Sequence, residues 1–181
     1  MFLGRLRQSW SLIDASQRTF VSRVLIAIVI WLVVDGLVGL DVYLTGFVSE
    51  LSLWMVHAGF DGGVILEYRG AVRDQFHTQQ LCMVGPSSVI GIGHSCNGKE
   101  IMFLFSAFIF ALPGFNWKRK WVFVLMGVMA LAIANAFRVA MLYVIMRDAP
   151  QWFEIAHKNI FQMVMYVIMV AIWLVFMRRK G

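Results

Sequence analysis

Four apolar segments constrain the fold of this chain more than any other feature of its sequence. They lie at residues 24–40, 99–114, 121–146 and 159–177, and an α-helix that crosses a bilayer core needs about 20 mostly apolar residues. Hydrophobic residues make up 60% of the chain and charged residues 14%, whereas soluble domains average about half and about a quarter. We therefore predict an all-α membrane protein, a single domain over residues 1–181 with about four transmembrane helices.

Lys and Arg residues lie beside these segments in three clusters. The clusters are residues 5–23, with four arginines, residues 118–120 and residues 178–180. If four helices cross the membrane, all three clusters lie on one side, and an excess of Lys and Arg marks the cytoplasmic side. We therefore expect a multi-pass protein of the cell (inner, cytoplasmic) membrane with both termini inside. Residues 1–23 are then a cytoplasmic or interfacial segment that leads into the first span, and residues 41–98 form an extracytoplasmic loop.

The basic charge does not indicate a nucleic-acid partner. The net charge is +6, but the Lys and Arg residues gather where membrane-flanking residues lie, so membrane lipid is the expected contact. Cys82, His94 and Cys96 match no zinc-ligand spacing, and the sequence has no phosphate-binding glycine motif. We expect no metal, nucleotide or other cofactor.

The loop between the first two spans contains shorter patterns. Residues 41–60 carry apolar residues at mixed helical spacing, so they either lie along the membrane interface or extend the first helix. Two later runs, GGVILEYRG and SSVIGIGHS, are β-like and bounded by Gly, Pro and Ser. They favour a small extracytoplasmic β-hairpin that caps the helices.

Arg138 is the most costly residue to place in a membrane. It lies among apolar residues in MALAIANAFRVAMLYVIM, and an arginine inside a span faces the bundle interior or a wet cavity and has a partner. Its distance from the end of its helix places it in the outer half of the membrane, the side that also holds Cys96. Asn135, three residues earlier, shares its helical face. The alternative is a structural ion pair between Arg138 and Asp35 or another acid.

Cys96 lies where the polar stretch GIGHSCNGK meets the second span, and three interpretations are open for it. It forms a structural disulfide with Cys82 in the oxidising outer compartment, it is an inert buried thiol, or it is a nucleophile. A helix N-terminus or a nearby cation favours the reactive thiolate, and the start of the second span and Arg138 offer both. The backbone N–H groups of Asn97 and Gly98 would then face a developing oxyanion.

His157 precedes the fourth span and lies on the same outer side. Glu154, three residues earlier, is placed to orient its imidazole if this turn is helical. His94 is the main rival base, because residues two apart point the same way in an extended segment and the cysteine is two residues further on. A lone interfacial histidine is more often a solvated or packed side chain, as we expect for His57 and His77.

A thiol, a permanent cation and an imidazole thus converge on the outer surface of one bundle. In this hypothesis Cys96 attacks a carbonyl carbon to form a thioester. His157 passes the proton to the leaving amine and later takes one from the second nucleophile. Arg138 stabilises the thiolate or the tetrahedral oxyanion.

Three motifs, in this order along the chain, resemble those of the exosortase/archaeosortase family of membrane cysteine transpeptidases. Residues 95–98 (SCNG) are similar to the family's C-S-G nucleophile motif, residues 135–138 (NAFR) to its N-x-x-R motif, and His157 to its histidine. The resemblance covers residues 62–181. Asn97 stands where the family has serine, and the chain has room for about four spans where many members have more, so it resembles a compact version.

The resemblance implies a substrate class. The substrates would be secreted proteins with a C-terminal tail made of a short sorting motif, a transmembrane helix and a basic cluster. Cleavage at the outer membrane surface would give an acyl-enzyme, and the product would pass to an acceptor that the sequence does not name: a lipid, an amine or water. A membrane cysteine protease that only hydrolyses its substrate shares the same acyl-enzyme.

Two interpretations that assign the chain a function other than peptide-bond cleavage remain. One is a non-catalytic membrane scaffold or assembly protein, in which Cys82 and Cys96 form a disulfide and Arg138 is an anchor. The other is a transporter or proton relay that uses Asp35 and Arg138, although no span is interrupted in corresponding positions of two halves.

Overall fold

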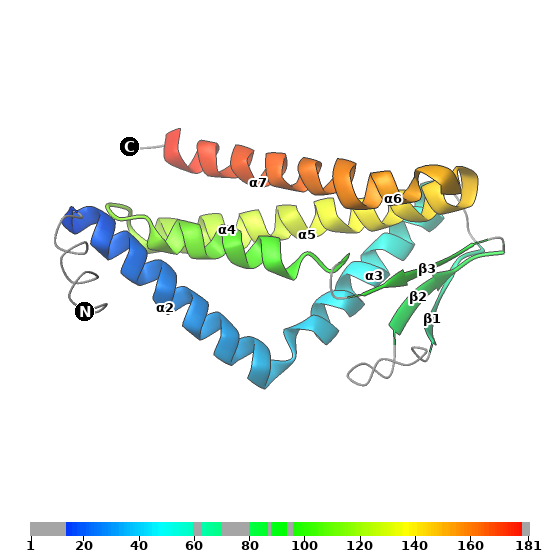
Figure 1. The fold of residues 1–181 in the computed structure, drawn as a ribbon, viewed down its shortest axis with the longest axis horizontal. Helices are drawn as coiled ribbons and strands as arrows, with labels where there is room; N and C mark the ends of the chain where they lie inside the picture. The colour runs from blue at the N-terminus through cyan, green and yellow to red at the C-terminus, as the bar shows by residue number, and fades with distance from the viewer. Residues whose placement is uncertain (1–13, 60–62, 70–79, 87, 94–95, 179–181) are drawn as a thin grey trace, which may run out of the picture.

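The described part of the chain is mostly helical, with a small sheet at one end of a helical bundle (Figure 1). The computed structural model describes residues 14–59, 63–69, 80–86, 88–93 and 96–178. The helices are α2 (Ala15–Val38), α3 (Leu40–Gly59), α4 (Lys99–Ala111), α5 (Trp117–Asp148) and α7 (Phe161–Arg178). Three short turns join α5 to α7: η2 (Pro150–Trp152), α6 (Phe153–Ile155) and η3 (Ala156–Ile160).

Three helical stretches within the described residues are long and apolar enough to cross a membrane: Ala15–Asp35, Trp117–Asp148 and Pro150–Arg178. At this level the prediction of a mostly helical chain with long apolar helices is confirmed. The predicted second span is also a helix, but α4 has 13 residues, or about 20 Å at 1.5 Å per residue. Because a bilayer core is about 30 Å thick, α4 alone does not meet the expectation of a fourth full-length span.

Gly39 separates α2 from α3. Its φ of 62° lies in the left-handed region, which glycine adopts without the steric cost that a Cβ brings, and the two helices diverge there in a V (Figure 1). α2 reaches α4 through aromatic contacts, including Trp31 with Phe103 at a centroid distance of 4.4 Å. Most of residues 41–60 thus form a separate helix that follows the first one after a break.

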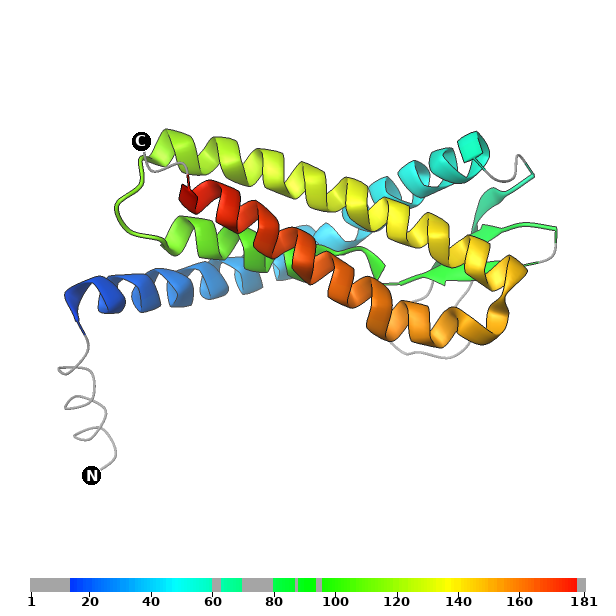
Figure 2. The ribbon, with the colours of Figure 1, turned by 90° about the horizontal axis from the view of Figure 1, so that it is seen from above.

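The helices α4, α5 and α7 pack together and share an apolar core (Figure 2). Phe105 and Ile109 of α4 contact this core together with Leu131 of α5 and with Met169 and Phe176 of α7, and all five side chains are buried. This core fixes the relative positions of the three helices that carry the candidate site.

Gly127 of α5 marks the closest approach of α4 to α5. A Cβ at this position would lie 2.2 Å from Cζ of Phe105, a fully buried ring. Gly127→Ala must therefore displace the ring, and we expect the free energy of unfolding in detergent to fall by about 1–3 kcal/mol. Gly46→Ala in α3 is the matched control, because nothing lies within 4 Å of its Cβ and alanine favours a helix by about 1 kcal/mol. Equal unfolding midpoints for the two variants would be inconsistent with this packing.

Two cations of the 118–120 cluster bind helix ends. Lys120 is 2% exposed, and its Nζ donates to the carbonyls of Phe110, at 2.9 Å, and Leu112 at the end of α4. Arg119 donates from Nη2 to the carbonyl of Phe176 in the last turns of α7, at 2.8 Å. The last carbonyls of a helix lack an intrahelical partner, so these side chains stabilise the end of the bundle opposite to Cys96.

A three-stranded antiparallel sheet covers the other end of the bundle. Its strands pair in the order β1 (Ile65–Arg69), β2 (Gln80–Val84) and β3 (Val89–Ile92). Met83 and Ile92 belong to the same apolar core as Tyr143 of α5. The two predicted β-like runs contain β1 and β3, but the expected hairpin between them is wrong, because β2 lies between these two strands.

Candidate active site

Cys96 lies between β3 and α4, and the structure brings it to His157. Cys96 Sγ is 3.4 Å from Nε2 of His157, across 61 positions of sequence. The Cys96 N–H donates to the carbonyl of Gly93 at 2.9 Å, which makes the backbone turn just before α4 begins at Lys99. The two candidate residues therefore form a thiol–imidazole pair at the start of α4.

His157 is carried by η3, a π-helical turn between α6 and α7. Such turns are rare and occur frequently at functional sites. The ring of His157 stacks on Phe153, with centroids 5.7 Å apart and planes at 7°. The expected role of Glu154 is wrong, because its Oε1 lies 3.4 Å from Nζ of Lys158 at the surface. Phe153, not Glu154, is thus the neighbour that orients the imidazole.

Asn135 of α5 holds the turn that carries the thiol. The side chain is fully buried, and its Nδ2 donates to the carbonyl of Cys96 at 2.7 Å. Gly98 has a φ of 73°, and a Cβ there would lie 3.0 Å from Cγ of Asn135. Only glycine therefore allows this close approach without displacing the amide. Asn135 Oδ1 is buried and has no hydrogen-bond partner among the residues that the structure describes.

Arg138 lies three residues after Asn135 on α5 and is half-buried. Its Nε is buried without a hydrogen-bond acceptor in the described part of the chain. The alternative ion pair with Asp35 is wrong, because Asp35 binds Nζ of Lys99 at 2.9 and 3.0 Å. A buried N–H without an acceptor costs free energy, and in a native structure this pattern calls for an explanation such as a catalytic role.

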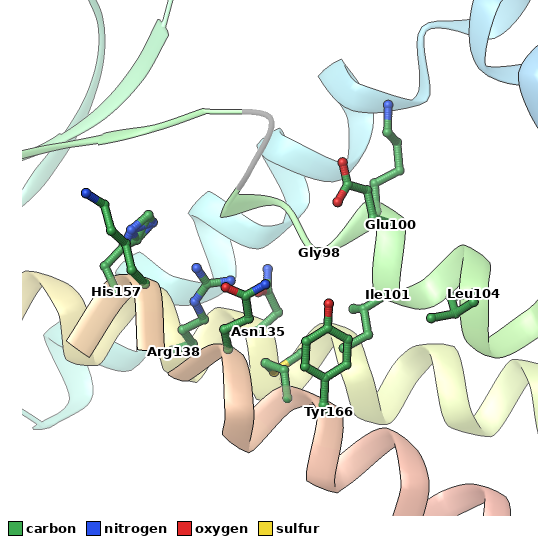
Figure 3. Close-up of a pocket in the computed structure, with 12 residues that line it drawn as sticks. Gly98, Glu100, Ile101, Leu104, Asn135, Arg138, His157 and Tyr166 are labelled. Carbon is green, nitrogen blue, oxygen red and sulfur yellow. The ribbon is translucent and has the colours of Figure 1, made fainter. Parts of the chain in front are cut away.

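A cavity of about 390 Å³ brings these side chains together (Figure 3). Gly98, Asn135, Arg138 and His157 line it, with residues of α4 and α7 on the remaining sides. In Figure 3 the side chains of Asn135 and Arg138 point toward the segment that carries Gly98. The volume of the cavity lies in the range of about 300–1,000 Å³ that is typical of ligand sites.

Asn97 supports the turn through its side chain. It is fully buried, its Oδ1 accepts the backbone N–H of Lys99 at 2.9 Å, and its Nδ2 lies 3.4 Å from Oγ1 of Thr45. These contacts connect the start of α4 to α3. Asn97 therefore fixes the position of the segment that contains Cys96 and Gly98.

The remaining predicted residues that the structure describes do not join this site. His94 and His77 lie outside the described residues. His57 is engaged elsewhere, with Nε2 2.6 Å from the carbonyl of Val64. Cys82 is buried in β2, and no disulfide joins it to Cys96. The structure thus lacks the cross-link on which the disulfide interpretation depends.

Besides Lys99 and Glu100 of α4, three polar residues that the sequence patterns did not single out line the cavity. Lys158, Gln162 and Tyr166 lie on η3 and α7. They are spaced by four residues, so they share one helical face. A row of polar side chains at this spacing in an apolar segment is the signal that identifies them.

No protein-family model matches the chain, and no curated protein or solved structure shows detectable similarity to it. The geometry of the site is therefore the basis on which a function can be inferred. A thiol beside an imidazole is an arrangement for nucleophilic catalysis. A guanidinium and a buried amide in the same cavity are groups that bind developing negative charge and a peptide backbone.

Proposed function

We propose that this chain is a membrane-embedded cysteine peptidase or transpeptidase that cleaves the C-terminal sorting tails of secreted proteins. The observation that carries the proposal is the 3.4 Å contact between Cys96 Sγ and His157 Nε2. A nucleophile within hydrogen-bonding reach of a base, whose ring is in turn held by a neighbour, is the arrangement that covalent catalysis requires.

Three residues divide the chemical steps: Cys96, and Arg138 and His157, which line the cavity. Cys96 gives its proton to His157 and attacks the carbonyl carbon of the scissile peptide bond. Arg138 donates to the negative oxygen of the tetrahedral intermediate. When the intermediate collapses, His157 returns the proton to the leaving amine. The acyl group is then a thioester on Cys96, and water or another nucleophile releases it.

The position of the site along the bundle supports a substrate that is cut at the end of a membrane helix. Arg138 lies ten residues before the end of α5 at Asp148, or about 15 Å at 1.5 Å per residue. α2 begins and α7 ends at the same end of the molecule, opposite the sheet (Figure 1). The basic clusters mark that end as cytoplasmic, so the site faces the outside. Both termini are then inside, and α4 with its connection to α5 returns the chain across the membrane.

Labelling of Cys96 tests the proposal without a known substrate. In a chain with Cys82→Ala, a membrane-impermeant maleimide added to intact cells should modify Cys96 without reductant. Arg138→Ala should slow this reaction by about tenfold or more, since a hydrogen bond to a charged group contributes about 1.5–3 kcal/mol and a nearby cation favours the thiolate. Arg147→Ala is the matched control, because Arg147 of the same helix pairs with Asp148 at 2.7 Å.

Two outcomes would count against the proposal. If Cys96 of the native chain reacts only after reduction, and Cys82→Ala makes it reactive, the cysteines form a disulfide and the scaffold interpretation is favoured. If Cys96 reacts only in permeabilised cells, the site faces the cytoplasm and secreted proteins cannot be its substrates.

A further inference from the structure

β3 is an edge strand that leads directly to the proposed nucleophile. The sheet order is β1-β2-β3, so one side of β3 pairs with β2 and the other side pairs with no described strand. Cys96 follows Ile92, the last residue of β3, by four residues. Figure 1 shows β3 as the strand of the sheet that lies nearest to α6, the element just before the turn that carries His157.

The register shows which backbone groups of β3 face the free side. The N–H of Gly85 donates to the carbonyl of Ser88 at 2.9 Å, and hydrogen-bonded pairs alternate with non-hydrogen-bonded pairs in an antiparallel ladder. The following pairs are Val84 with Val89, Met83 with Ile90, and Cys82 with Gly91. Ile90 therefore bonds to β2, whereas Val89 and Gly91 direct their N–H and C=O groups away from it.

The two residues of β3 whose backbone groups face this side are both exposed. Val89 is 41% exposed, and Gly91, whose surface is all backbone, is exposed as well. Proteins protect edge strands with charged residues, proline or bulges, because unpaired backbone groups attract other strands. β1, at the opposite edge, carries Glu67. β3 (VIGI) carries neither a charge nor a proline.

We propose that the free edge of β3 binds the substrate polypeptide as an added strand, on the acyl side of the scissile bond. This inference rests on the proposed function, which places a peptide carbonyl at Cys96 Sγ and makes the leaving side a membrane helix. Only the acyl side is then extended chain outside the membrane. Val89 and Gly91 exchange hydrogen bonds with alternate residues of that chain. Such main-chain bonds give affinity that depends little on side-chain identity.

Peptidyl chloromethyl ketones test the proposal, because a cysteine thiolate displaces their chloride and forms a thioether. The probes are acetyl-alanyl chloromethyl ketones with one to five alanines, and the full chain with Cys82→Ala is held in detergent. Intact-mass measurement gives the rate of alkylation of Cys96, and chloroacetamide reports the reactivity of the thiol alone. We expect the rate to rise about tenfold or more from the shortest to the longest probe, since each added hydrogen bond contributes a factor of about 2–13.

Gly91→Pro removes one outward N–H and leaves the pairing with β2 in place, because an edge strand tolerates proline where the N–H faces solvent. Gly91→Ala keeps that N–H and is the matched control. We expect the length dependence to disappear in Gly91→Pro and to persist in Gly91→Ala. N-methylation of the probe's amides should abolish the length dependence in the chain that keeps Gly91. This result tests the role of the β3 edge even if Gly91→Pro does not fold.

The outcomes separate this inference from the proposed function. If chloroacetamide alkylates Cys96 but the rate is independent of probe length, or N-methylation has no effect, the role of the β3 edge is overturned and the thiol–imidazole pair stands. If Cys96 does not react even with chloroacetamide, the proposed function fails, and the β3 proposal fails with it.

Discussion

Cells in which His157→Ala replaces the native chain should accumulate uncut precursors of the proteins that the native chain processes. His157 Nε2 lies 3.4 Å from Cys96 Sγ, so the substitution removes the group that, in the proposed mechanism, takes the thiol proton and delivers it to the leaving amine. A general acid–base group contributes about 10²–10⁴-fold to the rate, and we expect processing to slow by about that factor. Mass spectrometry of C-terminal peptides from membranes measures the effect, and Cys96→Ala cells define which precursors are substrates.

Glu154→Gln is the matched control for this prediction. Glu154 lies three residues before His157, but its carboxylate is exposed and pairs with Lys158. Its loss should leave processing at the native rate. If His157→Ala cells process the same proteins normally, His157 is not the base, and His94 becomes the first candidate to test.

The residues of the candidate site could be predicted because each one is unusual in its surroundings. Arg138 and Asn135 interrupt an apolar run, and a membrane span keeps such groups only where they face a partner or a cavity. Cys96 and His157 stand at the ends of apolar segments, on the same side by the charge bias. The 3.4 Å distance between Cys96 Sγ and His157 Nε2 could not be predicted from the sequence. It depends on the π-helical turn η3 and on the packing of α4, α5 and α7.

The parts of the fold that sequence patterns did not predict depend on contacts between distant residues. α4 ends at Ala111, just before Pro113, as a proline favours, but the binding of Lys120 to the carbonyls of that helix end has no local signal. β2 is defined by its pairing with β1 and β3, and strand preference depends strongly on such neighbours. Asp35 pairs with Lys99, not Arg138, because the break at Gly39 and the packing of α2 on α4 bring those two together.

Gly98→Ala should slow tail processing by more than its effect on stability explains. The φ of 73° at Gly98 is a conformation in which a Cβ costs about 1–2 kcal/mol. That Cβ would also lie 3.0 Å from Cγ and 3.1 Å from Nδ2 of Asn135, a fully buried side chain. The amide must shift, which weakens its 2.7 Å hydrogen bond to the Cys96 carbonyl. Because a misplacement of about 1 Å can cost 10²-fold, we expect processing to slow by about 10–10²-fold.

Gly114→Ala separates the backbone cost from the effect on the site. Gly114 has a φ of 83° and lies between α4 and α5, and nothing is within 4 Å of its Cβ. Both variants should lower the unfolding midpoint in detergent, Gly98→Ala by the larger amount because its Cβ also displaces Asn135, whereas only Gly98→Ala should slow processing. Equal processing by both variants would mean that Asn135 does not hold Cys96 in the catalytic position. Since both substitutions carry the same backbone strain, a difference between them reports the contact through which α5 positions the nucleophile.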